Sequence, residues 1–315
     1  MADTSPARGR WAFRPVPPEP RSITELIRSG TLDAELAATI WLLIEGRVPV
    51  IVAGDGRGVG KSTLLAAILD FLPPGLRVVE LRGLDETFDW LPQASELGWP
   101  GVPAHPMAGP PIRPDDTVLL AAELSDHTPA YTWGEAARLV VRAATIGYGL
   151  GATIHGDSLD DVFAQLRSNP VRLTDDELSR LGVVLVLRIV GGRRRVVAAH
   201  FVRPVVRDVH GHLQRLGPAV LATWDPAADA FEHFGWGVTP ELAMRVGRKP
   251  GDFEVDQAAR REFLDALVGE GVTAVAAVRP RLAGFRGPTA SDPPDERSST
   301  SGVASTGTPS TSPGG

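Results

Sequence analysis

Residues 53–63, AGDGRGVGKST, form a glycine-rich segment between two stretches with different secondary-structure preferences. Before it lies VPVIVAG (48–54), a β-branched apolar run that favours a buried strand. After it lies KSTLLAAILDFL (61–72), which favours a helix that ends at the following Pro-Pro-Gly. A strand, a glycine-rich turn and a helix in this order are typical of a phosphate-binding loop.

The glycine spacing departs from the usual G-x-x-x-x-G-K-[ST] pattern by one position. Counting back from Gly60, the first glycine is expected at position 55, where the sequence has Asp55, and Gly54 stands one place earlier. Either the Asp55 carboxylate lies near the phosphate cradle and weakens anion binding, or Gly54 is the hinge of a loop that is one residue longer. We favour the longer loop, because the strand then ends normally at VAG.

This loop predicts a nucleotide site of the Walker A type. Its backbone N–H groups would surround phosphate oxygens, and the N-terminus of the following helix would add its dipole. Lys61 would neutralise the β- and γ-phosphates of ATP, and Ser62 would ligate Mg²⁺. The alternative is a glycine-rich turn that binds nothing. The predicted nucleotide-binding residues are Gly56, Arg57, Gly58, Val59, Gly60, Lys61, Ser62 and Thr63.

Two further candidate residues accompany predicted buried strands. Glu123, in TVLLAAELSD, is expected just past a strand beside the loop strand, where it would orient a water molecule or organise the Mg²⁺ shell. The alternative is an ordinary strand-end acid in a cap or salt bridge. His155, in ATIHGDS, ends a strand at 151–155 and would hydrogen-bond the terminal phosphate. The alternative is a strand-end histidine satisfied by its neighbours.

Alternating strand and helix patterns over 22–285 predict an α/β fold with a largely parallel sheet. Runs at 183–190 and 194–202, joined by two glycines, and a second pair in AVLATWD and AFEHF predict antiparallel hairpins at one edge. The predicted domains are a Pro-rich tail at 1–21, an α/β domain at 22–235, a small helical segment at 236–285 with helices at about 254–268 and 271–285, and a disordered Ser/Thr/Pro/Gly tail at 286–315.

Several local signals refine this scheme. Thr174 and Glu177 predict a capping box, and Thr239 is predicted as an N-cap followed by proline at the first helical position. A helix is expected over 132–149, and the long stretch 87–116 is expected to be irregular and either functional or flexible. The basic run at 193–195 is interpreted as an exposed hairpin flank.

Composition narrows the functional classes. The 315-residue chain has a formal net charge of −6 and no cysteine. It also has no apolar run of the roughly 18 residues needed to span a bilayer. The acidic balance without a dense Lys/Arg cluster argues against nucleic acid as the main ligand. MADTSPARGRWAF at the start lacks the apolar stretch of a secretory signal. A cytoplasmic protein is predicted.

The order of the three motifs is itself informative: a phosphate loop, an acid about 60 residues later and a histidine about 30 residues after that. This order resembles the type II/IV secretion ATPase superfamily, nearest to archaeal flagellum/pilus motor ATPases and tight-adherence pilus ATPases. AELSDHT resembles the family's Gly-Glu-x-Arg-Asp-x-Glu-Thr block, in which Glu123, Asp126 and Thr128 match. ATIGYGLGATIHGDSLDDVFAQL resembles the family's histidine box.

The resemblance implies a RecA-like P-loop fold and a hexameric ring that couples ATP hydrolysis to assembly of a pilus-like filament. It also implies a membrane platform protein as partner, and a cytoplasmic location that includes the inner face of the cell membrane. Glu123 and His155 would be the catalytic residues. The N-terminal domain usual in the family is not expected here, so either a partner chain would supply it or efficient turnover would be lost.

Several positions depart from the family pattern. Ala122 and Ser125 replace a glycine and an arginine around the acid, and Tyr148 stands at the first histidine of the box. Glu80 and Glu86 both remain candidates for a further acidic motif of the family. Two alternatives to an active motor therefore stay open: a nucleotide-binding regulatory or assembly subunit with weak or no turnover, and a P-loop phosphotransferase.

Overall fold

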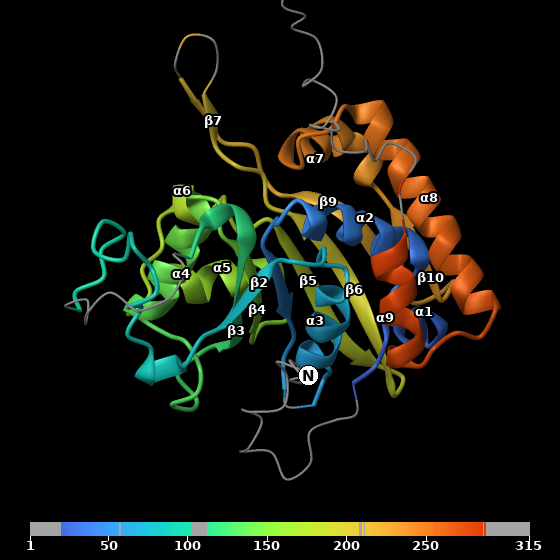
Figure 1. The fold of residues 1–315 in the computed structure, drawn as a ribbon, viewed down its shortest axis with the longest axis horizontal. Coiled ribbons are helices and arrows are strands. Elements are labelled where there is room, and N and C mark those ends of the chain that lie inside the picture. Colours follow the sequence, from blue (N-terminus) through green and yellow to red (C-terminus); the bar gives the residue numbers. More distant parts are fainter. Residues whose placement is uncertain are drawn as a thin grey trace, which may run out of the picture.

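The computed structural model describes residues 20–56, 58–101, 112–207, 210, 212–285 and 287. Within these residues an eight-stranded mixed sheet carries helices on both faces, with the order β10-β9-β6-β5-β1-β4-β3-β2 (Figure 1). Four neighbouring pairs are parallel and three are antiparallel. The predicted α/β fold class is confirmed. None of the helices described is long and apolar enough to cross a membrane.

The parallel half of the sheet centres on β1 (Val50–Ala53), whose four residues are all buried. Its neighbours are β4 (Gly149–Ile154) and β5 (Val183–Val190). β3 (Thr117–Leu124) pairs with β4, and β2 (Arg77–Glu80) forms the edge. A strand with parallel neighbours on both sides and helices on both faces must be apolar throughout, which explains the continuous run at 48–54.

The antiparallel half begins at β5, which pairs with β6 (Arg193–Phe201) across a tight turn. Gly191 and Gly192 in this turn have φ of 56° and 78°, the left-handed conformation that a two-residue hairpin requires. β9 (Ala219–Asp225) and β10 (Ala230–His233) complete the predicted edge hairpins. β7 (Val206–Arg207) and β8 (Leu213–Gln214) form a separate ribbon that projects from the main body (Figure 1).

The sheet separates two hydrophobic clusters, and β1 contributes alternate residues to each. Val50 and Val52 join the first cluster, whereas Ile51 and Ala53 join the second. This alternation follows from the two-residue period of a strand and makes the fold a three-layer structure. The site described below lies at the carboxyl end of β1, between these layers.

The first cluster joins helices from both ends of the described chain. The helices that contribute to it are α1 (Ile23–Arg28), α2 (Ala34–Glu45), α3 (Lys61–Leu69), α7 (Thr239–Arg245), α8 (Pro250–Gly269) and α9 (Val275–Gly284). Trp41 of α2 lies at its centre, stacked on Phe71 with a centroid distance of 4.8 Å and close to Phe263 and Phe285. The C-terminal helices therefore pack on the N-terminal ones.

The second cluster lies under helices on the opposite face of the sheet. These helices are α4 (Glu135–Thr145), α5 (Leu159–Arg167) and α6 (Asp175–Leu178). The predicted capping box is present at the start of α6: the Thr174 hydroxyl accepts from the Glu177 N–H, and the Glu177 carboxylate accepts from the Thr174 N–H.

Some predicted boundaries and environments are wrong. The helix expected over 132–149 covers only Glu135–Thr145, and Thr239 is the first helical residue after Val238 rather than the N-cap. Arg195, expected to be exposed, is 3% exposed and pairs with Asp229 at 3.1 Å. The irregular stretch at 87–116 ends in a short 3₁₀ turn, Pro114–Asp116, and a second turn, Gly83–Asp85, precedes it; η3 (Gly235–Val238) precedes α7. Nearly all of both predicted tails lies outside the described residues.

Candidate nucleotide site

The glycine-rich loop joins β1 to α3, as its sequence predicts. β1 ends at Ala53, and the Gly54 N–H still donates to the Ile154 carbonyl at 3.2 Å. A Cβ at Gly54 would lie 2.7 Å from the Leu187 carbonyl oxygen and 3.0 Å from a Val59 methyl. Glycine is therefore required at position 54 because β5 and the end of the loop approach it closely.

Three glycines give the loop its shape. Gly56, Gly58 and Gly60 have φ of 82°, 79° and 108°, a conformation that residues with a side chain rarely adopt. A Cβ on Gly56 or Gly58 would meet no atom within 4 Å, so the space beside these residues is open. Gly60 is the N-cap of α3, which places Ser62 and Thr63 in its first turn. Arg57 lies outside the described residues.

Lys61 begins α3 and is 6% exposed. Its ammonium donates to the Gly54 carbonyl at 3.0 Å and lies 3.6 Å from Glu123 Oε2. This cation therefore lies beneath the loop and pairs with the second sequence candidate. An anion bound on the loop would compete with Glu123 for Lys61, because both offer oxygen acceptors.

Glu123 lies inside β3, not past its end as expected. The register between β3 and β4 shifts between Ala121 and Leu124, so β3 carries one extra residue there. Such a bulge changes the direction of nearby side chains, and the Thr153 hydroxyl bonds the Ala122 carbonyl at 2.6 Å within it. Glu123 is 7% exposed although it belongs to a strand of apolar neighbours.

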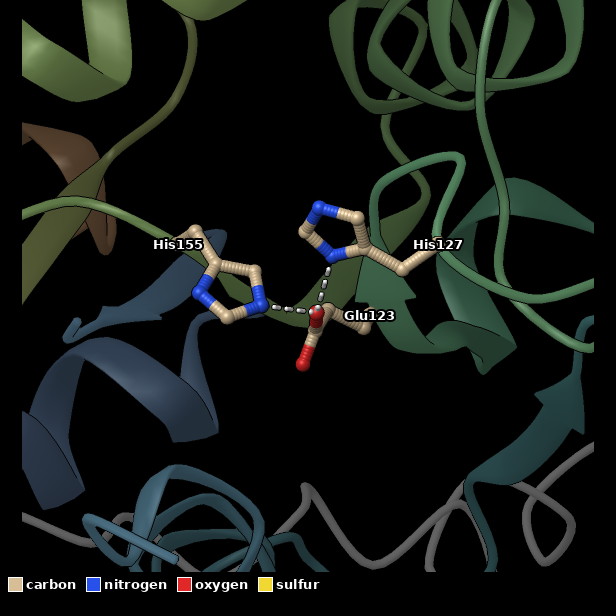
Figure 2. Close-up of side chains that lie close together, drawn as sticks. All are labelled: Glu123, His127 and His155. Carbon is tan, nitrogen blue, oxygen red and sulfur yellow. Dashed lines mark ion pairs between the residues drawn. The ribbon is translucent and has the colours of Figure 1, made fainter. Parts of the chain in front are cut away.

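His155 follows β4 directly, and its Nε2 lies 2.8 Å from Glu123 Oε1. The Ser125 hydroxyl donates to the same oxygen at 3.3 Å. Figure 2 shows His127 approaching Glu123 from the loop after β3, with Nδ1 3.9 Å from Oε1. The two imidazole rings meet edge to face, with centroids 4.8 Å apart.

The structure thus brings Lys61, Glu123 and His155 together, as the motif order suggests. It also adds residues that sequence reasoning did not select. His127 belongs to the quoted AELSDHT segment, and its position four residues after Glu123 is the signal that could have found it. Arg194 extends from β6 over the loop and donates to the Gly58 carbonyl at 3.0 Å.

The further acidic candidates have different environments. Glu86 is 5% exposed, and its carboxylate accepts hydrogen bonds from the N–H groups of Arg82 and Phe88 and from the Trp90 indole. These bonds occupy both of its oxygens and organise the turn after β2. Glu80 ends the edge strand β2 and is exposed. Tyr148 is buried and its hydroxyl donates to the Ile112 carbonyl at 3.3 Å.

The sequence matches no known protein-family profile. It is 25% identical over 258 residues to the uncharacterized protein MJ1287 of Methanocaldococcus jannaschii, covering 78% of this chain and 90% of that protein. It is 24% identical over 257 residues to MJ0900 of the same organism, covering 79% of this chain. The chain spans slightly less than half, 45%, of the length of MJ0900.

Two solved structures are similar at low TM-scores. The VirB11 ATPase from the Brucella suis type IV secretion system is 18% identical with a TM-score of 0.32, covering 64% of this chain and 52% of VirB11. The Legionella pneumophila ATPase DotB is 14% identical with a TM-score of 0.32, covering 84% of this chain and 66% of DotB. The chain thus spans under two thirds of each structure.

Proposed function

We propose that this protein binds and hydrolyses ATP as a motor subunit of the type II/IV secretion ATPase superfamily. The observation that carries the proposal is the buried contact between Lys61 and Glu123, 3.6 Å apart, at the junction of the glycine-rich loop and β3. A strand–loop–helix element with a lysine at the helix start, facing an acid from a neighbouring strand, is the arrangement that phosphoryl transfer uses.

The residues present fit a bound nucleotide. Gly56 and Gly58 leave open space beside the loop, and Gly60 starts a helix whose N-terminal dipole favours an anion. Ser62 in the first turn offers the hydroxyl that would ligate Mg²⁺. When bound, this ion supplies positive charge to the β- and γ-phosphates.

The contacts suggest how the side chains act during hydrolysis. Phosphate oxygens would draw Lys61 away from Glu123 Oε2, which then becomes free to accept a hydrogen bond from the attacking water. Glu123 Oε1 keeps its contact with His155 Nε2 at 2.8 Å, so the carboxylate stays oriented. Lys61 and the loop N–H groups stabilise the charge that develops on the transferred phosphoryl group.

One observation favours the regulatory alternative with weak turnover. Asp55 Oδ1 accepts a hydrogen bond from the Gly56 N–H at 2.8 Å. A carboxylate therefore already binds one of the N–H groups that would bind phosphate. A negative charge there opposes phosphate binding. The partners implied by the sequence resemblance belong to the proposal as well: a hexameric ring, or a second chain that completes the nucleotide cleft, together with a membrane platform protein.

The first experiment measures ATP binding by calorimetry, and Mg²⁺-dependent phosphate release, for wild type and Lys61→Ala. We expect ATP affinity to fall at least about 100-fold, because losing a charge-assisted contact worth about 3 kcal/mol changes affinity by that order. Lys249→Ala is the matched control, since Lys249 is the other lysine of the sequence and is exposed.

Each outcome decides between hypotheses. Turnover that Lys61→Ala abolishes supports the ATPase. Binding without turnover in wild type favours the regulatory subunit. Equal ATP affinity in wild type and Lys61→Ala would exclude the phosphate-binding interpretation of the loop.

A further inference from the structure

We propose that Glu123, His127 and His155 form a binding site for a transition-metal dication such as Zn²⁺, distinct from the Mg²⁺ position at Ser62. These three residues come from β3, from the loop after β3 and from the end of β4 (Figure 2). Each offers one ligand atom, and the three atoms lie within 4.8 Å of one another.

The geometry is close to that of a bound ion. With bonds of about 2.1 Å, tetrahedral donor atoms lie roughly 3.4 Å apart. Glu123 Oε1 lies 2.8 Å from His155 Nε2 and 3.9 Å from His127 Nδ1, on either side of this value. Small side-chain rotations would therefore place all three donors around one ion, with a fourth position open to water.

The donor set indicates the class of metal. Two imidazoles and one carboxylate suit Zn²⁺ and neighbouring first-row ions, whereas Mg²⁺ prefers oxygen ligands. Lys61 contacts the other Glu123 oxygen, Oε2, so the two cations would occupy different oxygens of one carboxylate. His127 has 56% of its side chain exposed, which gives the ion access from solvent.

The backbone around these residues is held in place. The Thr132 N–H donates to the Glu123 carbonyl at 2.9 Å, which closes the loop that carries His127. The Gln165 amide donates to the His155 carbonyl at 2.8 Å. A metal would thus meet ligands whose main chains are already positioned, which lowers the ordering cost of binding.

Asp55 lies on the side of His155 where metal-binding histidines usually have a carboxylate or carbonyl partner. Its Oδ1 lies 3.9 Å from His155 Nδ1, the ring nitrogen that faces away from Glu123. A carboxylate there favours the tautomer that leaves Nε2 free for a metal. The residue that departs from the phosphate-loop pattern therefore has a role in this site.

Metal binding would also regulate the proposed hydrolysis, a consequence that rests on the proposed function. An ion held by Glu123 withdraws electron density from the carboxylate that orients the attacking water. Zinc occupancy is therefore expected to inhibit turnover, and removing zinc with a chelator is expected to restore it.

The test titrates the nucleotide-free 315-residue chain with Zn²⁺ by calorimetry. His127→Ala, which removes a proposed ligand, is expected to weaken zinc affinity by at least about 100-fold. Asp55→Asn is expected to weaken it roughly tenfold, the smallest loss usual for a residue that contacts a metal ligand. His212→Ala is the control, because His212 is an exposed histidine outside the cluster. Absence of zinc binding by wild type, or equal affinity in wild type and His127→Ala, would overturn the proposal.

ATP binding by the same variants separates this proposal from the proposed function. His127→Ala is expected to bind ATP like wild type, because His127 is 56% exposed on the loop after β3, whereas the proposed phosphate cradle is the glycine-rich loop before α3. Zinc binding that persists in a protein without ATPase activity supports the metal site alone, whereas zinc-insensitive turnover contradicts the regulatory consequence.

Discussion

Lys61 illustrates, at the scale of a single residue, how burial makes a side chain specific for one kind of ligand. It is 6% exposed, and the Gly54 carbonyl and Glu123 lie close to its ammonium. A buried ammonium is stable only with such partners, because desolvation disfavours an isolated charge. In the proposed site a phosphate would take the place of Glu123 beside Lys61, because both present negatively charged oxygen atoms.

Arg194 gives a residue-scale prediction. Its guanidinium donates to the Gly58 carbonyl at 3.0 Å and so lies beside the loop that we expect to hold phosphates. Arg194→Ala should weaken ATP affinity about tenfold, which corresponds to about 1.4 kcal/mol. This value is near the lower end of the range of energies for hydrogen bonds to charged groups. Arg193→Ala is the matched control, because Arg193 is 69% exposed and pairs with Asp229. Equal losses in both variants would show that the hairpin charge acts non-specifically.

At the scale of elements, the β-bulge in β3 is decisive for the site. The extra residue between Ala121 and Leu124 changes the alternation of side chains along the strand. Glu123 thereby meets Lys61 and His155 from within a buried strand. In a regular strand, side chains alternate between the two faces without interruption. The bulge interrupts this alternation beside Glu123.

A second contact between elements predicts a pH dependence. His233 of β10 lies 2.7 Å from Asp33, the N-cap of α2, and 3.8 Å from Glu35. Burial lowers the pKa of His233, but the hydrogen bond to Asp33 and the charges of Asp33 and Glu35 outweigh it, so the pKa is raised overall. This stabilisation is fully present below the unfolded pKa of about 6.5 and is lost as pH rises through the folded value.

His233→Ala should therefore destabilise the protein more at pH 5.5 than at pH 8. We expect the free energy of unfolding to fall by about 1 kcal/mol more at pH 5.5 than at pH 8. This is the contribution of a charged hydrogen bond, reduced because the pair is partly exposed to solvent. Urea denaturation of both proteins at both pH values measures it. Burial lowers the pKa of His200, so His200 makes the protein less stable at low pH. This contribution is the same in wild type and His233→Ala and cancels in their difference. A difference independent of pH would contradict the linkage.

For the whole molecule, the cluster around Trp41 joins both ends of the described chain. Trp41 of α2 contacts Phe263 of α8 and Phe285 after α9, and the Arg260 guanidinium lies 5.3 Å from its ring centroid. α8 and α9 therefore share a core with the helices beside the glycine-rich loop. The predicted boundary near 235 separates two sequence patterns, whereas the hydrophobic cluster crosses it.

Trp41→Ala should lower the free energy of unfolding by about 3–5 kcal/mol, because it leaves a large cavity in a packed aromatic cluster. Trp236→Ala is the control, since Trp236 is 78% exposed. We expect a single denaturation transition in both proteins, because one hydrophobic cluster spans α2, α8 and α9. Two transitions would mean that the segment at 236–285 unfolds on its own.

The sequence alone determined the element types, the position of the loop and the order of the three motifs. Strand and helix periods are local properties, so β1, α3 and the Gly191–Gly192 hairpin were predictable. Local spacing also identified Lys61, which follows the glycine-rich turn, and Glu123, which follows an apolar run about 60 residues later.

Only the tertiary structure decided which side chains meet. The meeting of His127 with His155, and of Arg194 with Gly58, depends on strand order and on a bulge whose position no local pattern indicated. The exposure of Arg195 was also predicted wrongly. Its charge favours solvent, yet the side chain is buried, with Asp229 and the Ser29 carbonyl as partners. Burial of polar groups depends on partners distant in the chain, and local propensity holds no information about them.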